Sequence, residues 1–296
     1  MSIETKPVYK NTIKFYFIAL AVLLFSYIFM GGDCSTNDND NPIPPKTVAP
    51  PENVKLIIDA DPGGGESFAK ISWTASSDES ESDFRGYRVT TYALNSSNQV
   101  SYIFEVRAVS KSVNSYTVSS IDRNVRYKST VLAELTNGIQ SAFIETPVYS
   151  GVYYNNNGSI NSHVDENSLS GYGWDIQSGN GNQYLYIENN SSLIDFHLRE
   201  TSGTLFFYSP DFFQNNFKSS KISLVGLGQA AFDQTELNEP DKTGIAIEDE
   251  NVYLLKTQAG YYIKIWIRDI DNIQNYSNVK FDYKVQSLEG LRILKK

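Results

Sequence analysis

The chain has a single cysteine, Cys34, so no disulfide can form within it and its stability must come from packing and strand pairing. Histidine is almost as scarce, and the two present are His163 and His197. Most hydrolytic and metal-dependent chemistries need several such side chains. The sequence also lacks GxSxG, HExxH, CxxC and phosphate-loop motifs. We therefore predict no catalytic activity, no catalytic residues and no metal site.

Positive charge is also limited. The chain has 34 acidic and 25 basic residues, a formal net charge of −9, and its basic residues form no stripe. Such a surface repels the phosphate backbone. Nucleic acid is therefore excluded as a partner.

Helical periodicity is hard to find after Met30, whereas residues that favour strands are abundant. The chain has 20 Tyr and 16 Phe but only 2 Met, and Thr, Val and Ile are frequent. Without its first segment the chain is long enough for two domains. We expect an all-β protein with two domains.

The N-terminal segment has the layout of an export signal. Lys6, Lys10 and Lys14 precede an unbroken apolar run over residues 15–30. The run is shorter than the roughly 20 residues that usually span a membrane. Residues 1–33 are therefore predicted to be a signal peptide.

Cys34 lies just beyond the apolar run, an arrangement that resembles bacterial lipoproteins. The resemblance implies cleavage before Cys34, lipidation of its sulfur and new amino group, and anchoring at the outer membrane or cell surface, with a periplasm-facing location as a variant. Gly31 and Gly32 fit the small residues of the family pattern, but Asp33 departs from it. Three alternatives remain: an uncleaved anchor, secretion after cleavage elsewhere, and a relaxed recognition site.

Residues 34–51 are rich in Pro, Asn and Asp and have almost no large apolar side chain. Such a segment cannot recover its ordering entropy by burial. Its prolines favour extended polyproline conformation. We predict a disordered tether that acts as a semi-stiff spacer.

Residues 52–148 contain short alternating strands separated by turn-forming residues, with strands expected at 54–58, 69–73 and 86–90. The strand ending in Trp73, the Gly86-Tyr87-Arg88-Val89 strand and Tyr127 occur in the order of a fibronectin type III domain, which they resemble. The resemblance implies an antiparallel β-sandwich used as a spacer or adhesion module. In such a sandwich Trp73 fills the core and the Tyr127 hydroxyl holds a corner.

Residues 152–296 are again strand-like, with strands expected at 183–188, 204–208, 219–227 and 279–285. We expect a second antiparallel β-sandwich or a jelly-roll-like domain. Two alternating runs, 251–256 and 261–267, flank a short turn that contains Gly260 and predict a β-hairpin.

The second run of this hairpin has two distinct faces. Tyr261, Ile263, Ile265 and Ile267 share a core face, and Tyr262 and Trp266 share the other face with the cations Lys264 and Arg268. That second face is either an exposed stacking surface for a sugar or a partly covered sheet edge.

The hairpin has the sequence motif Lys256-Thr257-x-x-Gly260-Tyr261-Tyr262-x-Lys264. This motif resembles that of surface lipoproteins of Bacteroidetes and related bacteria, which include the haem-binding HmuY-like family. That family holds haem iron between two histidines. The resemblance makes His163 and His197 candidate haem ligands.

The sequence thus predicts an exported, lipid-anchored, cell-surface protein that acts as a non-catalytic binding, adhesion or surface-assembly module. Its partners are expected to be the membrane, through the lipid on Cys34, and a protein or glycan at the cell surface. The alternative is an uptake lipoprotein that binds haem, another small ligand or a glycan.

Overall fold

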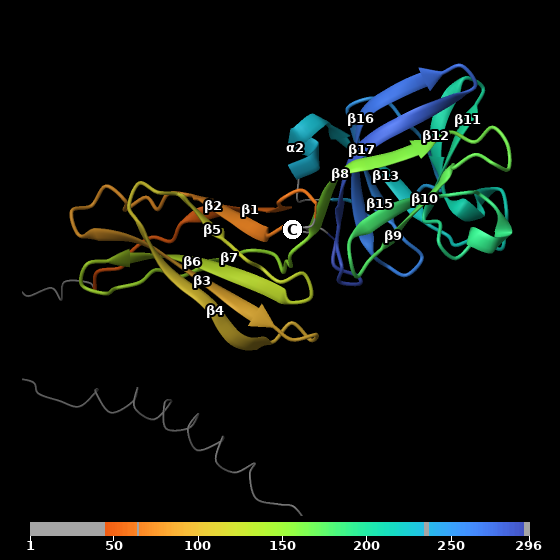
Figure 1. The fold of residues 1–296 in the computed structure, drawn as a ribbon. Coiled ribbons are helices and arrows are strands. Elements are labelled where there is room, and N and C mark those ends of the chain that lie inside the picture. The colour runs from red at the N-terminus through yellow and green to blue at the C-terminus, as the bar shows by residue number, and fades with distance from the viewer. Residues whose placement is uncertain (1–44, 64, 234–236, 293–296) are drawn as a thin grey trace, which may run out of the picture. The chain divides into compact units, whose positions relative to one another are not determined.

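The computed structural model describes residues 45–63, 65–233 and 237–292. The predicted signal peptide, Cys34 and most of the predicted tether lie outside these residues. From Lys46 onward the chain forms one compact unit, and almost all of its regular structure is antiparallel β-sheet (Figure 1). The predicted all-β fold is confirmed. In the described part of the chain, no helix has the length and apolar character needed to cross a membrane.

The first sandwich consists of two antiparallel sheets. One sheet has the order β1-β2-β5 and the other β4-β3-β6-β7. Their strands are β1 (Glu52–Ala60), β2 (Ser67–Thr74), β3 (Phe84–Leu94), β4 (Val100–Ser110), β5 (Ser115–Val118), β6 (Arg126–Leu135) and β7 (Ile144–Glu145).

The core of the first sandwich is built around Trp73 and Tyr127. Trp73 is 5% exposed and meets the ring of Tyr87 edge-on at 5.3 Å between centroids. The Tyr127 hydroxyl accepts the backbone N–H of Asp122 at 3.1 Å. The ring of Tyr127 is buried while its hydroxyl fixes the preceding turn, as expected for a tyrosine corner.

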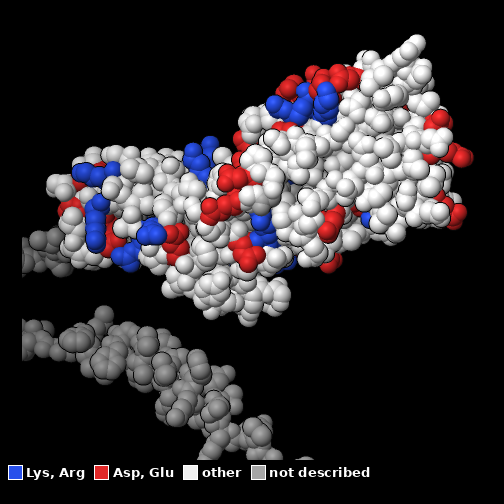
Figure 2. Space-filling model, viewed as in Figure 1, with Lys and Arg blue, Asp and Glu red and all other residues white. Residues whose placement is uncertain are grey.

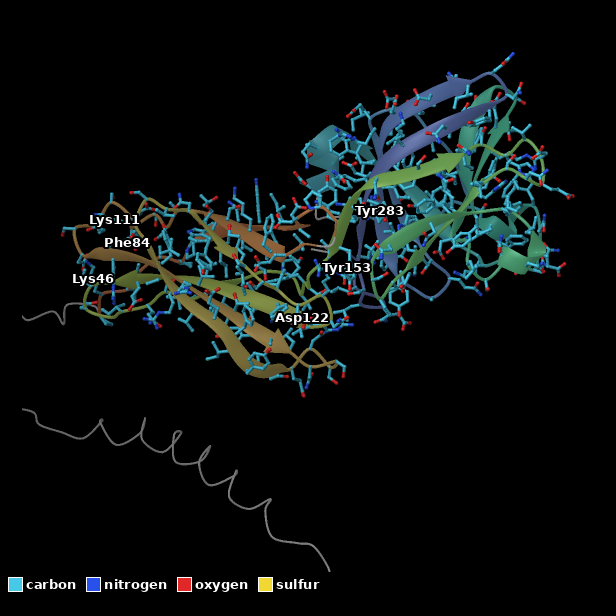
Figure 3. All side chains as sticks on the ribbon, viewed as in Figure 1. Lys46, Phe84, Lys111, Asp122, Tyr153 and Tyr283 are labelled. Carbon is cyan, nitrogen blue, oxygen red and sulfur yellow. The ribbon has the colours of Figure 1, made fainter. Side chains whose placement is uncertain are left out.

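The segment before β1 packs on this sandwich. Val48 is buried, and the backbone of Ala49 donates its N–H to Asp78 and accepts the hydroxyl of Ser76, both at 2.7 Å. Lys46 forms a 2.8 Å ion pair with Asp83 and lies at the same end as Phe84 and Lys111 (Figure 3). The packed structure therefore begins before the predicted boundary at residue 52, because these contacts hold the last residues of the predicted tether.

The second sandwich also consists of two antiparallel sheets, with the orders β13-β15-β16-β17-β8 and β10-β9-β11-β12-β14. Its strands are β8 (Tyr153–Asn161), β9 (Gly171–Asp175), β10 (Asn180–Tyr184), β11 (Phe196–Thr201), β12 (Thr204–Tyr208), β13 (Lys221–Leu227), β14 (Gly244–Ala246), β15 (Asn251–Lys256), β16 (Tyr262–Ile273) and β17 (Tyr276–Val285). Its helices are η1 (Glu188–Asn190), η2 (Pro210–Phe212) and α2 (Gly228–Asp233).

The predicted hairpin is β15 and β16, paired in register from Val252 with Trp266 to Lys256 with Tyr262. The three isoleucines of β16 at 263, 265 and 267 are fully buried between the two sheets. The strand expected over 183–188 instead ends at Tyr184. There the carbonyl of Leu185 accepts the backbone N–H of Ile187 and the side-chain amide of Asn190, which turns the chain into η1.

Strand β4 is an edge of its sheet and carries several exposed apolar residues. Val100, Tyr102, Ile103 and Val106 are each about half exposed, at 59%, 54%, 58% and 49%. The pairing of β4 with β3 shifts twice, so two bulges interrupt its first half, and the register is regular only over 105–110.

Charged side chains are interspersed rather than segregated on the face shown in Figure 2, where lysine and arginine lie beside aspartate and glutamate. No continuous basic stripe is visible on that face. The acidic excess of the sequence is thus not accompanied by a basic patch on this face.

Candidate functional site

Tyr262 and Trp266, the candidate stacking residues, are both buried, at 3% and 7% exposure. The Tyr262 hydroxyl donates to the carboxylate of Glu239 at 2.9 Å. The Trp266 indole donates from Nε1 to Glu250 at 3.2 Å and packs against Phe232 of α2. The structure therefore has the covered arrangement, and the exposed platform that a sugar would need is absent at these two residues.

His163 and His197 lie together, with ring centroids 5.3 Å apart. An isolated parallel bridge between His163 and Arg199 places the end of β8 beside β11. His197 Nδ1 is 3.1 Å from the carbonyl of Ser170, and His163 Nδ1 is 3.2 Å from the hydroxyl of the same residue. Ser170 thus orients both imidazoles.

This pair does not fit haem ligation. His197 is fully buried, and one face of its ring stacks on Tyr186 at 3.8 Å between centroids. A porphyrin plane between the two histidines would have to break this stack and open the cluster around Tyr186. His163 and His197 are therefore not arranged as haem ligands.

The environment keeps both histidines neutral. Burial above all, with smaller contributions from His163 and Arg199, lowers the pKa of His197 to about 3. Burial, followed by the charge of Arg199, also lowers the pKa of His163. Since the Ser170 carbonyl can only accept, His197 donates from Nδ1, which leaves its Nε2 buried and without a hydrogen-bond partner. We interpret the pair as a packing element.

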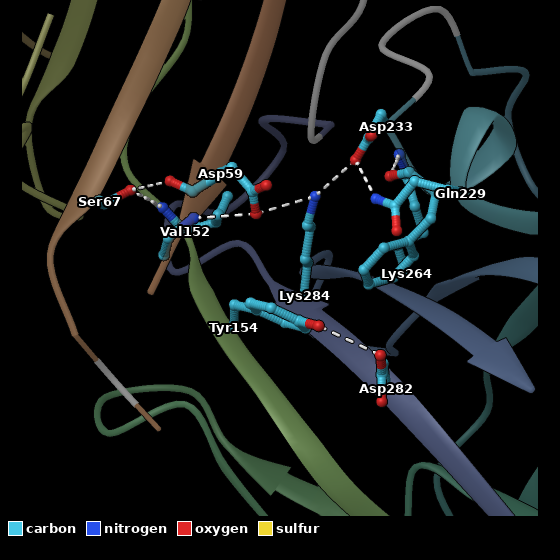
Figure 4. Close-up of polar contacts among 11 residues, drawn as sticks. Asp59, Ser67, Val152, Tyr154, Gln229, Asp233, Lys264, Asp282 and Lys284 are labelled. Atoms are coloured by element: carbon cyan, nitrogen blue, oxygen red, sulfur yellow. Dashed lines mark hydrogen bonds and ion pairs between the residues drawn. The ribbon is translucent and has the colours of Figure 1, made fainter. Parts of the chain in front are cut away.

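A buried polar cluster joins β1 of the first sandwich to β17 of the second (Figure 4). Lys284 is 1% exposed, and its Nζ lies 3.1 Å from Asp59 and 3.3 Å from Asp233 at the end of α2. The same ammonium lies 4.5 Å from the ring centroid of Phe232. Two carboxylates and an aromatic face thus surround a charge that water cannot reach.

Lys264 lies opposite Lys284 on the neighbouring strand and is equally buried. Its Nζ donates to the carbonyl of Phe232 at 2.9 Å. Burial, followed by the charge of Lys284, lowers the pKa of Lys264 to about 7. The cluster therefore contains one lysine that is held by two carboxylates and a neighbouring lysine that titrates near neutrality.

The linker between β7 and β8 is held by hydrogen bonds at the same junction. The N–H of Val152 donates to the hydroxyl of Ser67 at 2.9 Å, and that hydroxyl donates to the carbonyl of Asp59 at 3.1 Å (Figure 4). The hydroxyl of Ser150 donates to Gln286 at 2.9 Å. The linker is consequently fixed to both sandwiches.

A cavity of about 380 Å³ opens at one end of the second sandwich. It is lined by Trp174, Ile176, Asp195, Lys218, Thr257, Gln258, Ala259 and Tyr261. Sequence reasoning did not single out these residues as a site. They come from separate segments, and the only local signal is the Gly171-Tyr172-Gly173-Trp174-Asp175 run, in which glycines flank an aromatic residue.

The first sandwich matches a known family. The model of the fibronectin type III domain matches residues 49–146, the stretch that contains the two sheets, Trp73 and the Tyr127 corner. Residues 49–146 are a fibronectin type III domain. The resemblance seen in the sequence is confirmed for this part of the chain, and the domain indicates a binding or adhesion module.

A solved structure also matches part of the chain. The third fibronectin III domain of the human KIAA0343 protein, determined in solution, has 17% identity to this chain and a TM-score of 0.27. The match covers 40% of this chain and 90% of the human domain. No curated protein matches the chain.

Proposed function

We propose that this protein is an exported, lipid-anchored, non-catalytic binding protein of the cell surface. In this proposal the fibronectin type III domain holds the second sandwich away from the membrane and presents it to a partner. The observation that carries the proposal is the junction of Asp59, Lys284 and Asp233, through which the second sandwich is attached to the fibronectin type III domain.

The junction supports a display role because it resists hinge motion. Separating the two sandwiches would leave the ammonium of Lys284 without Asp59 and would break the Val152–Ser67 hydrogen bond. Buried charges that lose a partner are strongly destabilising. The second sandwich is therefore presented in a fixed orientation relative to the fibronectin type III domain.

The N-terminal sequence supports the anchor. The apolar run over 15–30, followed by Cys34 after three further residues, is the arrangement expected of an exported lipoprotein. The proline-rich residues after Cys34 supply the distance between the lipid and the packed structure that begins at Lys46.

The test is to express the full chain in a bacterium with an outer membrane, as wild type and as Cys34→Ser, and to separate membrane from soluble fractions. We expect the wild type in the membrane fraction, with an intact mass that includes diacylglycerol and an acyl chain on a mature protein starting at Cys34. Cys34→Ser should lack this mass, and the matched control Ser35→Ala should retain it. A full-length cytoplasmic product with an unmodified Cys34 thiol would contradict the proposal.

A second measurement tests display. Protease added to intact cells should cleave the wild-type protein if it faces outward, while a periplasmic marker stays intact. Protection until the outer membrane is permeabilised would place the protein on the periplasmic side and contradict display at the cell surface.

A further inference from the structure

The cavity of the second sandwich lies where its two sheets meet at one end. Trp174 lies in β9 of one sheet, and Thr257, Gln258 and Tyr261 lie at the turn between β15 and β16 of the other. The cavity volume of about 380 Å³ is within the range of roughly 300–1,000 Å³ seen for small-ligand sites.

One part of the cavity wall is aromatic and rigid. Trp174 is 7% exposed, and its ring is wedged against Phe196 at 5.6 Å and Tyr283 at 5.7 Å between centroids. Tyr261 is half-buried, and its backbone is tied to Thr257 by hydrogen bonds in both directions. The ring of Trp174 and the backbone of Tyr261 are therefore held in place without needing to be ordered by a ligand.

Another part of the wall is polar but electrically balanced. The carboxylate of Asp195 is 4% exposed and accepts the ammonium of Lys218 at 3.1 Å and the backbone N–H of Trp174 at 2.9 Å. Gln258 accepts the backbone N–H of Ser219 through Oε1 at 3.2 Å. Since Asp195 and Lys218 neutralise each other, neither an anion nor a cation is favoured in the cavity.

The indole of Trp174 adds no donor to the cavity, because its Nε1–H is buried away from solvent. The polar groups of the wall include Asp195, Lys218 and Gln258. A ligand that carries hydroxyl groups suits this wall better than a hydrocarbon.

We propose that this cavity binds one ring of a neutral saccharide. The apolar C–H face of the sugar lies against the half-buried ring of Tyr261 and the part of Trp174 that lines the cavity, and its hydroxyls exchange hydrogen bonds with the Asp195–Lys218 pair and Gln258. This assignment rests on the proposed binding function and names its ligand class. It places the sugar in the cavity beside Tyr261 instead of at Tyr262 and Trp266, whose rings are covered.

The test uses the full chain, purified in detergent, in affinity electrophoresis through gels that contain soluble xylan, mannan, mixed-linkage β-glucan or starch. We expect at least one neutral polysaccharide to retard the wild type. Tyr261→Ala should weaken this binding at least tenfold, and Gln258→Ala should weaken it severalfold. Both side chains are at least partly exposed, so these variants should keep their fold, which circular dichroism checks.

The control variant is Phe212→Ala, because Phe212 is an aromatic residue of the same sandwich that is 51% exposed and lies outside the cavity lining. It should bind as tightly as the wild type. Absence of retardation in all four gels, or loss of binding in Phe212→Ala but not in Tyr261→Ala, would overturn the proposal. Binding of N-acetyltyrosinamide, with no polysaccharide binding, would also overturn it and would indicate an aromatic side chain of a protein partner.

These results are independent of membrane anchoring. The affinity gels use purified protein, so they give the same result whether or not Cys34 is lipidated. In turn, the absence of sugar binding would not change the membrane fractionation of the wild type and Cys34→Ser.

Discussion

Asp59 of β1 and Lys284 of β17 form a 3.1 Å ion pair between strands of two different sandwiches. Lys284 has lost its water, while the side chain of Asp59 is still 27% exposed. The cost of burying the ammonium is therefore met by Asp59, Asp233 and the ring of Phe232 together.

We expect Lys284→Met to lower the free energy of unfolding by roughly 2–3 kcal/mol, because Asp59 and Asp233 lose the ammonium that pairs with both of them. The control is Lys280→Met on the same strand, which also contacts two carboxylates but is 52% exposed. This control should cost clearly less, because solvent screens an exposed ion pair. Urea unfolding at pH 7 measures both, and equal losses would show that the junction contributes no more than a surface pair.

The lowered pKa of Lys264 predicts that the stability of the protein depends on pH above neutrality. Its pKa in the folded protein is about 7, below the usual value of 10.5, so the unfolded chain binds more protons between these two values. Stability should therefore rise as the pH increases from about 7 toward 10. In Lys264→Met this contribution, at most about 1.4 kcal/mol per pH unit, should disappear. Urea midpoints of both proteins at pH 7 and pH 9 test this, and parallel pH profiles would refute it.

His197 predicts a loss of stability in acid. Its pKa falls from 6.5 to about 3 on folding, so the unfolded chain takes up a proton over this range and the folded chain does not. Stability should decrease as the pH drops from 6.5 toward 3. His197→Phe keeps a ring against Tyr186 and should show a shallower decrease, although it is less stable at pH 8 because the Ser170 carbonyl loses one of its two donors and keeps only the N–H of Leu198. Thermal unfolding at pH 8, 6 and 4.5 distinguishes these outcomes, and identical slopes would count against the neutral state of His197.

Removing the hydroxyl of Tyr127 should cost about 1 kcal/mol, because the N–H of Asp122 loses its acceptor in a partly buried corner. Tyr102→Phe removes a hydroxyl from a residue of the same domain that is 54% exposed, and should change stability by less than about 0.5 kcal/mol. Chemical denaturation measures both, and a Tyr127→Phe variant as stable as Tyr102→Phe would mean that the corner bond does not contribute.

The local pattern of the sequence was sufficient to predict the hairpin of β15 and β16. Alternation fixes which residues share a face, and it assigned Ile263, Ile265 and Ile267 to the core correctly. Tyr261, which the same alternation placed on the core face, is only half-buried. Alternation does not reveal what covers the opposite face. Tyr262 and Trp266 are buried by Glu239, Glu250 and Phe232, which come from other parts of the chain.

The meeting of His163 and His197 depends on long-range pairing, which spacing alone does not define. It is set by the isolated bridge between His163 and Arg199 and by the two bonds to Ser170. The residues that line the cavity were even less predictable from spacing. Trp174, Asp195, Lys218 and Tyr261 come from four segments that become neighbours only when both sheets are assembled.

The two bulges of β4 have a consequence for proteins that crowd together on a surface. An exposed strand with apolar side chains such as Val100 and Ile103 is a template on which another chain can grow into an aggregate. The register shifts interrupt the repeat of free amides and carbonyls, so an incoming strand would find an even ladder only over residues 105–110. Neighbouring copies at high local concentration are thus kept from merging their sheets, although this edge has neither proline nor lysine to protect it.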